Sequence, residues 1–401
     1  MLPRRLQQDA MLSLLGSTGS IGESTLALVR EVENLTVFAL TANTNAAKLL
    51  AQCIEFAPHY AVLCDDSEAE WLRAALRESG CKTELLLGVD ALDQVASAPE
   101  VDMVMAAIVG AAGLSSTLAA AKAGKRLLLA NKEALVMTGD LLMSLARENG
   151  ATLLPIDSEH NAIFQCLPTN VEGVSEAQFT FVEKIVLTAS GGPFLRTPLG
   201  EFASITPEQA CAHPVWSMGS KISVDSATMM NKGLEFIEAC FLFGLDHKRV
   251  EVIIHPQSIV HSLVHYADGS VLAQMASPDM RVPIAHCLAW PDRIQTSAPR
   301  LDLTAQKPLE FAQPDLQRFP CLALGMEAAK ARGTAPALLN AANEVAVEAF
   351  LHAGLDFLAI AEVNAEVMAQ IPCETATSLA IIQTADFKAR KLANELIKKR
   401  I

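Results

Sequence analysis

The sequence predicts an α/β protein of several domains, and three observations support this prediction. Over residues 11–156, short apolar runs alternate with helical patterns, which is typical of a parallel sheet built from βαβ units. Between residues 184 and 274 the predicted strands lie closer together, as in a mixed sheet with helices. Beyond residue 319 the sequence is rich in Ala, Leu and Glu and has a helical pattern. A chain of 401 residues is also long for one core, which favours two or three domains.

The elements of the first region follow from its apolar runs. One stretch, 103–121, carries no charge, but glycines and a Ser-Ser-Thr triplet interrupt it. We therefore interpret it as a buried strand, a glycine turn and a helix rather than a membrane span. The predicted strands are 11–15, 36–41, 60–64, 101–108, 126–130 and 152–156, and the helices between them include 21–32 and 46–56.

The rest of the chain divides at a proline-rich segment. Five prolines between residues 291 and 320, with few periodic runs, predict an extended connector before the helical end. Upstream of it we predict strands at 184–189, 251–254, 258–266 and 270–274, a polar loop at 197–220 and a helix at 226–243.

Composition excludes several classes of protein. The net charge of −14 and a pI near 5.1 argue against a nucleic-acid-binding surface. The nine cysteines are scattered without a C-x-x-C pair, which is typical of reduced thiols in a cytoplasmic protein. The apolar run after Arg4-Arg5 is too short for a signal peptide. We expect a cytoplasmic protein without a membrane span.

The stretch GSTGSIG, residues 16–22, follows the first predicted strand and opens a helix. No lysine follows Gly22, so the loop is not a triphosphate-binding Walker loop. The helix N-terminus, together with the hydroxyls of Thr18 and Ser20, offers donors to the phosphate of a dinucleotide. The alternative is a helix entry that binds nothing.

The end of the second strand bears on the choice of cofactor. An NAD site usually has an acidic residue there, bonded to the ribose 2′-hydroxyl. Here the strand ends in Asn43-Thr44-Asn45, without an acid, which favours NADP. No Arg or Lys takes that place, and Lys48 is the nearest cation.

Asn131-Lys132-Glu133 follows another strand, at the edge of the sheet where ligands bind. Lys132 could polarise a carbonyl or hold a hydroxyl. The alternative is a solvated lysine that begins a helix, and for this motif alone we favour the alternative.

Three carboxylates suggest a metal site. Asp157 and Glu159 lie two apart at a strand end, which places both on one side. Hard oxygen ligands suit Mg²⁺ or Mn²⁺. On the helix predicted at 226–243, Glu235 shares a face with Asn231 and Lys232. The alternatives are exposed loop acids and a solvated Lys–Glu pair.

Two loops add candidate anion and lid residues. Ser190 precedes two glycines at a strand end, where free N–H groups can bind an anion. His213, Trp216 and Met218 lie in a segment without periodicity, which suggests a lid over a ligand. The segment with Ser190 could equally be a simple turn, and the segment with Trp216 could equally be a loop packed on its own domain. His255 and His261 fit a strand pattern and are expected to be structural or pocket-lining.

Taken together, these motifs resemble one family. GSTGSIG, ANKEALV, PIDSEHNAIFQ, TASGGPF, HPVWSMGSKISVDSATMMNKGLE, IHPQSIVHS and LNAANEVAV occur in the order and spacing of the 1-deoxy-D-xylulose 5-phosphate reductoisomerase family. The similarity covers essentially the whole chain after residue 10. The motifs DSEHN and SVDSATMMNKGLE are highly specific, whereas GSTGSIG alone is weak.

The resemblance implies a role for each matching residue. Cofactor contacts are expected from Thr18, Gly19, Ser20, Ile21, Asn45, Asn131, Glu133 and Gly219. The metal ligands are expected to be Asp157, Glu159 and Glu235. The substrate is expected to meet Lys132 and Ser158 at its reacting end, Ser190, Ser226, Asn231 and Lys232 at its phosphate, and the lid residues His213, Trp216 and Met218.

The resemblance also implies a reaction and an organisation. NADPH and Mn²⁺ or Mg²⁺, with Co²⁺ as a further candidate, would support rearrangement and reduction of a phosphorylated ketose in isoprenoid biosynthesis. The rearrangement would run by retro-aldol cleavage or by a 1,2-shift. A homodimer is expected, with a Rossmann-like NADP-binding domain at 1–157, a catalytic and dimerisation domain at 158–291, a linker at 292–315 and a C-terminal helical domain at 316–401.

Two departures and two rivals accompany this hypothesis. The family often has Gly-Lys-Asn where Asn43-Thr44-Asn45 stands, and Arg or Lys in place of Ser220, which weakens the expected 2′-phosphate contacts. One rival is a semialdehyde dehydrogenase, for which Cys166 would be the nucleophile. The other is an NADP-sensing regulator without catalysis, which has no use for three carboxylates.

Overall fold

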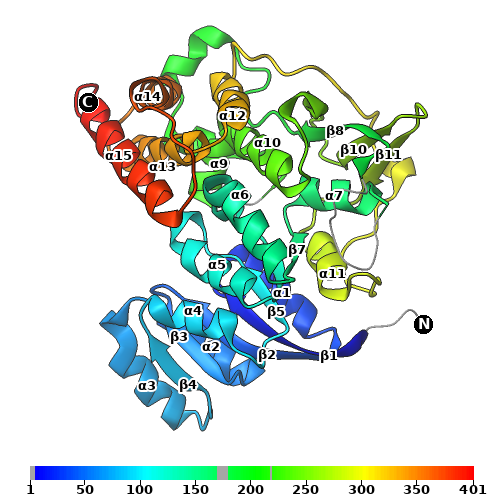
Figure 1. Cartoon of the computed structure of the whole chain (residues 1–401), viewed down its shortest axis with the longest axis vertical. Helices are drawn as coiled ribbons and strands as arrows, with labels where there is room; N and C mark the ends of the chain where they lie inside the picture. The colour runs from blue at the N-terminus through cyan, green and yellow to red at the C-terminus, as the bar shows by residue number, and fades with distance from the viewer. Residues whose placement is uncertain (1–4, 169–178, 217–218) are drawn as a thin grey trace.

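The computed structural model describes residues 5–168, 179–216 and 219–401 (Figure 1). Its first region is a parallel seven-stranded sheet in the order β4-β3-β2-β1-β5-β6-β7, with helices between the strands. The α/β prediction is confirmed. The strands are β1 Arg5–Leu15, β2 Glu33–Ala42, β3 Tyr60–Leu63, β4 Glu84–Leu87, β5 Met103–Ala106, β6 Arg126–Leu129 and β7 Thr152–Pro155.

The helices of this region follow the predicted pattern. The sheet contains one strand, β4, that was not predicted. The uncharged stretch forms β5, a short 3₁₀ turn and α5, as predicted. Strand β4 was not predicted, because it is a four-residue edge strand with no fully buried side chain. The helices are α1 Ser20–Val29, α2 Ala46–Phe56, α3 Ala69–Glu78, α4 Asp90–Ser97, α5 Leu114–Lys122 and α6 Lys132–Glu148.

The second region holds the predicted mixed sheet, in the order β11-β10-β8-β9. Strands β8 and β9 pair in parallel, whereas β10 runs antiparallel to both β8 and β11. Helix α7 packs against β10 and β11. The elements are α7 Ser158–Cys166, β8 Val182–Ala189, β9 Val250–Ile254, β10 Val260–Tyr266, β11 Val271–Met275 and α11 Arg281–Ala289.

The single helix predicted at 226–243 is wrong. Two helices, α9 Ser220–Ala227 and α10 Met230–Leu242, replace it. Met229 between them has a left-handed backbone with φ 59°, a conformation that ends a helix. The polar loop predicted at 197–220 also contains the 3₁₀ turn Leu199–Ser204 and the helix α8 Pro207–Cys211, which Thr206 and Gln209 cap reciprocally.

The chain ends in a helical region, as predicted. After the connector, whose residue Ala312 bridges to Ile254, the helices are α12 Pro320–Ala331, α13 Ala335–His352, α14 Phe357–Gln370 and α15 Leu379–Ile397. In Figure 1 they lie at the end of the molecule away from the parallel sheet, and α6 lies between them and that sheet. Helix α6 packs on both α10 and α13.

No helix in the three described ranges is both long and apolar enough to cross a lipid bilayer.

Helices α10 and α12 pack backbone to backbone. A Cβ added to Gly325 in α12 would lie 2.4 Å from the Cα of Gly233 in α10. Only two glycines permit this approach. Helix α12 therefore fixes the position of α10, which carries Asn231, Lys232 and Glu235.

Replacing Gly325 with Ala should therefore push α12 away from α10. We expect a loss of about 1–3 kcal/mol in the free energy of unfolding, measured by urea denaturation. The control is Gly200→Ala, because a Cβ there meets no atom within 4 Å. Equal stability of the two variants would contradict the close packing.

Candidate active site

A cavity of about 710 Å³ lies at the carboxyl end of the parallel sheet. Its wall joins the glycine loop to the second region and to the segment before α9. Such crevices are where open α/β sheets bind ligands. Of the predicted residues, the wall includes Gly19, Ser20, Ile21, Asn131, Lys132, Glu133, Asp157, Ser158, Glu159, Ser190, His213, Trp216, Gly219, Ser226, Asn231, Lys232 and Glu235.

The glycine loop forms one end of this wall. Gly19 is the N-cap of α1, so the first N–H groups of the helix face the cavity. A Cβ at Gly22 would lie 2.4 Å from the carbonyl oxygen of Ser17, whereas a Cβ at Gly19 would meet nothing closer than 3.6 Å. The last glycine therefore serves the tight turn, and Gly19 leaves room for a ligand.

Two predicted cofactor residues lie beside the wall rather than on it. The carbonyl oxygen of Thr18 accepts a hydrogen bond of 2.9 Å from the Lys48 ammonium. The side chain of Asn45 caps α2 and accepts from the Lys48 backbone N–H at 3.1 Å. Both residues have structural partners here, and neither lines the cavity. Met218 lies outside the described residues.

The three predicted metal ligands converge. Asp157 is the N-cap of α7, Glu159 lies in its first turn, and Glu235 comes from α10. Carboxylate oxygens of all three lie within 4.8 Å of one another. Their side chains are 13%, 19% and 2% exposed, so the alternative of solvated loop acids is wrong.

Two lysines supply positive charge between these carboxylates. The Lys132 ammonium lies 2.7 Å from Asp157 Oδ2 and 3.0 Å from Glu235 Oε1, and it donates to Asn231 Oδ1 at 2.9 Å. The Lys232 ammonium lies 2.7 Å from Glu159 Oε1 and also pairs with Glu235. Lys132 is buried, so the alternative of a solvated helix start is wrong.

This charge arrangement shifts the ionisation of the acids. Burial alone would raise the pKa of Asp157, but Lys132 and His160 outweigh it and hold that pKa well below its usual range. Burial and the neighbouring Glu235 raise the pKa of Glu159 to about 7. Three hard oxygen donors with a surplus of negative charge fit a divalent cation such as Mg²⁺ or Mn²⁺.

Sequence reasoning missed a fourth acid at this site. Glu238, one turn after Glu235 on α10, is fully buried, and burial raises its pKa to about 7. Its neighbour is His160 of α7, whose Nδ1 lies 3.7 Å from Glu238 Oε2. Burial opposes the charged form of His160, but Glu238 and Asp157 outweigh burial and raise its pKa to about 9.

Ser190 and His213 form a second polar centre. The Ser190 hydroxyl accepts from the Gly192 N–H at 3.1 Å and lies 3.0 Å from His213 Nε2. His213 Nδ1 accepts from the N–H groups of Val215 and Trp216. Burial lowers the pKa of His213, so the neutral ring carries its hydrogen on Nε2 and donates it to Ser190.

The start of α9 is tied to the dinucleotide side of the cavity by a residue that sequence reasoning missed. Lys221 pairs with Glu133 at 3.0 Å and with Asp225 at 2.9 Å. Both carboxylates are buried. Only the i, i+4 spacing of Lys221 and Asp225 was visible in the sequence.

The remaining candidates have structural roles. His255 is buried, and its Nε2 accepts from the N–H groups of Ile259 and Val260. His261 is buried beside Trp216, and burial lowers its pKa to about 4. None of the nine cysteines lines the cavity, and burial raises the pKa of Cys166 to about 11. The dehydrogenase rival therefore has no nucleophile at this site.

The fold and the cavity together define the class. A glycine loop at the end of a parallel sheet, three converging carboxylates and a polar group made of Ser190, Ser226 and His213 share one cavity. That combination is typical of a dinucleotide- and metal-dependent oxidoreductase that acts on a small anionic substrate.

Comparison with known proteins identifies the particular family. Residues 12–139 match the family model described as 1-deoxy-D-xylulose 5-phosphate reductoisomerase. Residues 153–243 and 275–392 match two models for C-terminal domains of the same enzyme. The chain belongs to the 1-deoxy-D-xylulose 5-phosphate reductoisomerase family.

Relatives and solved structures agree with this assignment. The reductoisomerase of Cellvibrio japonicus (strain Ueda107) is 57% identical, with 96% of this chain and 98% of the relative covered. That of Pseudomonas putida (strain W619) is 56% identical, with 97% and 98% covered. A Zymomonas mobilis enzyme in complex with NADPH has a TM-score of 0.90 at 46% identity, with 98% and 100% covered. A DOX-P reductoisomerase in complex with NADPH, fosmidomycin and magnesium has a TM-score of 0.92 at 48% identity, with 97% and 98% covered.

The converging carboxylates generate a binding prediction. Asp157→Asn and Glu235→Gln should each weaken Mn²⁺ binding at least about tenfold, because each removes a charged oxygen ligand. The affinity for NADPH should stay unchanged. Calorimetry measures the affinity for Mn²⁺, and NADPH fluorescence measures the affinity for NADPH. The control is Glu251→Gln, which changes an exposed residue. Unaltered Mn²⁺ binding would remove that residue from the metal site.

Proposed function

We propose that this protein converts 1-deoxy-D-xylulose 5-phosphate to 2-C-methyl-D-erythritol 4-phosphate with NADPH and a divalent metal, in non-mevalonate isoprenoid biosynthesis. The observation that carries this proposal is the single cavity shared by the glycine loop, the three carboxylates and the polar group of Ser190, Ser226 and His213. The names of the similar proteins support the same reaction.

The cofactor would occupy the end of the cavity formed by the parallel sheet. The start of α1 at Gly19–Ile21 offers backbone N–H groups to the pyrophosphate. Asn131, Glu133 and Gly219 line the same part of the wall. When bound there, NADPH would supply the hydride for the reduction of the rearranged skeleton.

Asp157, Glu159 and Glu235 would hold Mg²⁺ or Mn²⁺. When bound, such an ion polarises carbonyl oxygens as a Lewis acid. Lys132 lies among these carboxylates and can donate a hydrogen bond to an oxygen at the reacting end of the substrate. Ser158, hydrogen-bonded to Glu159 at 2.5 Å, adds a hydroxyl beside it.

The substrate phosphate would bind at the far side from the dinucleotide loop. Ser190, Ser226, Asn231 and Lys232 all line the cavity, and His213 supplies the N–H that Ser190 now accepts. The phosphate does not react, so its binding energy orients the ketose for the chemical step. Trp216 would cover the substrate and exclude water.

The organisation of the chain belongs to the same proposal. We divide it into an NADP-binding domain at 1–157, a catalytic and dimerisation domain at 158–291, a linker at 292–315 and a helical domain at 316–401. The protein is proposed to be a cytoplasmic homodimer that uses Mn²⁺ as well as Mg²⁺.

The test is NADPH oxidation with 1-deoxy-D-xylulose 5-phosphate as substrate. We expect turnover with Mg²⁺ or Mn²⁺, loss of turnover after EDTA, and recovery when metal is returned, because the carboxylates need the ion. Absorbance at the NADPH band measures the rate. An NADP-sensing regulator would bind NADPH without turnover, and that result would reject the enzyme.

The exposed turn after β2 generates a prediction on cofactor affinity. Thr44 lies where the family often has lysine, beside the exposed Asn43 and Asn45. Thr44→Lys should strengthen NADPH binding several-fold, because an added ammonium attracts the 2′-phosphate. NADH binding should not change, and fluorescence titration of both cofactors measures the difference. An unchanged Kd for NADPH would contradict our placement of the 2′-phosphate.

A further inference from the structure

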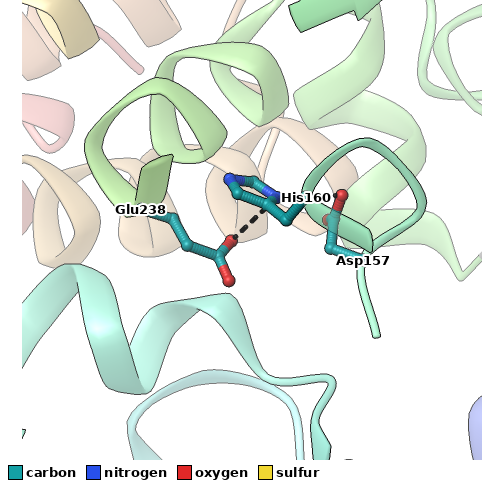
Figure 2. A group of neighbouring side chains, drawn as sticks. All are labelled: Asp157, His160 and Glu238. Atoms are coloured by element: carbon teal, nitrogen blue, oxygen red, sulfur yellow. Dashed lines mark ion pairs between the residues drawn. The ribbon is translucent and has the colours of Figure 1, made fainter. Parts of the chain in front are cut away.

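Glu238 is a buried acid whose charge the proposed reaction does not use. It is fully buried on α10, and neither of its carboxylate oxygens has a hydrogen-bond partner. A buried charged group without partners is costly. Figure 2 shows this carboxylate directed at His160, across the space between α10 and α7.

His160 is held in one orientation between Glu238 and Asp157. Its Nε2 lies 3.0 Å from the backbone carbonyl oxygen of Glu235. That oxygen can only accept, so Nε2 carries a hydrogen. The ring also stacks on Phe243, with ring centroids 6.2 Å apart and planes 16° apart. The ring therefore cannot turn without losing both contacts.

The fixed ring directs Nδ1 at two carboxylates. Nδ1 lies 3.3 Å from Asp157 Oδ1 and 3.7 Å from Glu238 Oε2. Asp157 has two oxygens, and its other oxygen, Oδ2, contacts the Lys132 ammonium. His160 thus contacts one oxygen of Asp157, while the second oxygen contacts the Lys132 ammonium, which also pairs with Glu235.

We propose that Glu238 and His160 are positioning residues that hold the Asp157 carboxylate in the orientation that binds the metal. Glu238 acts on the ring, and the ring acts on Asp157 Oδ1. Carboxylate–histidine contacts outside the ligand set commonly orient metal ligands, and their loss costs about 10–100-fold in metal affinity. This inference rests on the metal site of the proposed function.

The same three residues could instead bind a cation directly. One ligand atom from each of Asp157, His160 and Glu238 lies within 4.8 Å of the other two. Positioning is favoured because the Nε2 contact and the Phe243 stacking already fix the ring without an ion. A positioning role predicts one bound ion, whereas direct binding predicts a second one. The experiment counts the bound ions.

The experiment titrates Mn²⁺ into the NADPH-saturated protein by calorimetry. Glu238→Gln, which keeps the volume and removes the charge, should raise the Mn²⁺ Kd about tenfold, as should His160→Gln. The double variant should bind Mn²⁺ no more weakly than either single variant, because the two residues act as a unit. The stoichiometry should stay the same, and kcat should be regained when Mn²⁺ saturates.

The matched control is Asp93→Asn. Asp93 lies in α4, also has a buried carboxylate oxygen without a partner, and does not line the cavity. Its replacement should leave the Mn²⁺ Kd unchanged. In Glu238→Gln the NADPH Kd should not rise and the unfolding temperature should not fall, whereas a merely structural role would raise the first and lower the second. If one variant fails to fold, the other carries the test.

Three results would overturn the inference. The first is an unchanged Mn²⁺ Kd in both single variants. The second is a wild-type protein that binds two ions where a variant binds only one. The third is a kcat that stays low at saturating Mn²⁺. Failure of the proposed function gives a different result. A wild-type protein that binds Mn²⁺ but does not oxidise NADPH with the ketose phosphate rejects the reaction, and the Mn²⁺ titrations still decide the positioning role.

Discussion

The site depends on one constraint, which is the convergence of four carboxylates beside one cavity, two of them fully buried and two largely buried. Like charges at this separation repel, and burial strengthens the repulsion because solvent cannot screen it. Lys132 and Lys232 reduce the repulsion by contacting three of the four acids directly. The protein can therefore fold around a site that still carries a surplus of negative charge. The four acids are Asp157, Glu159, Glu235 and Glu238.

This constraint explains why the site is assembled from separate parts of the fold. Lys132 begins α6 directly after a strand of the parallel sheet, whereas Asp157 begins α7 at the carboxyl end of the neighbouring strand. Glu235 comes from α10, which the glycine contact with α12 holds in place. No single element carries both the acids and enough cations to balance them. The parallel sheet, the middle region and the C-terminal helices must dock for the charges to balance.

The sequence allowed the strand ends and their polar residues to be predicted, because strand ends of a parallel sheet share one edge. Asp157 and Glu159 were singled out by their spacing of two at a strand end, but they lie at the start of α7 rather than on a strand. The burial of Lys132 could not be predicted, because its partner Glu235 lies 103 residues away. Glu238 was hidden inside an apolar helix, and its role depends on His160 from another element. The break at Met229 was missed because no glycine or proline marks it in the sequence.

A second pair of carboxylates fixes the start of α9, because Lys221 in its first turn pairs with Glu133 of α6 and with Asp225. Asp225 also accepts a hydrogen bond of 2.7 Å from Asn343 in α13, whose own oxygen accepts from Asn364 in α14. This buried chain joins the cofactor side of the cavity to the C-terminal helices. Ser226 in the same helix is thereby held in the wall of the cavity.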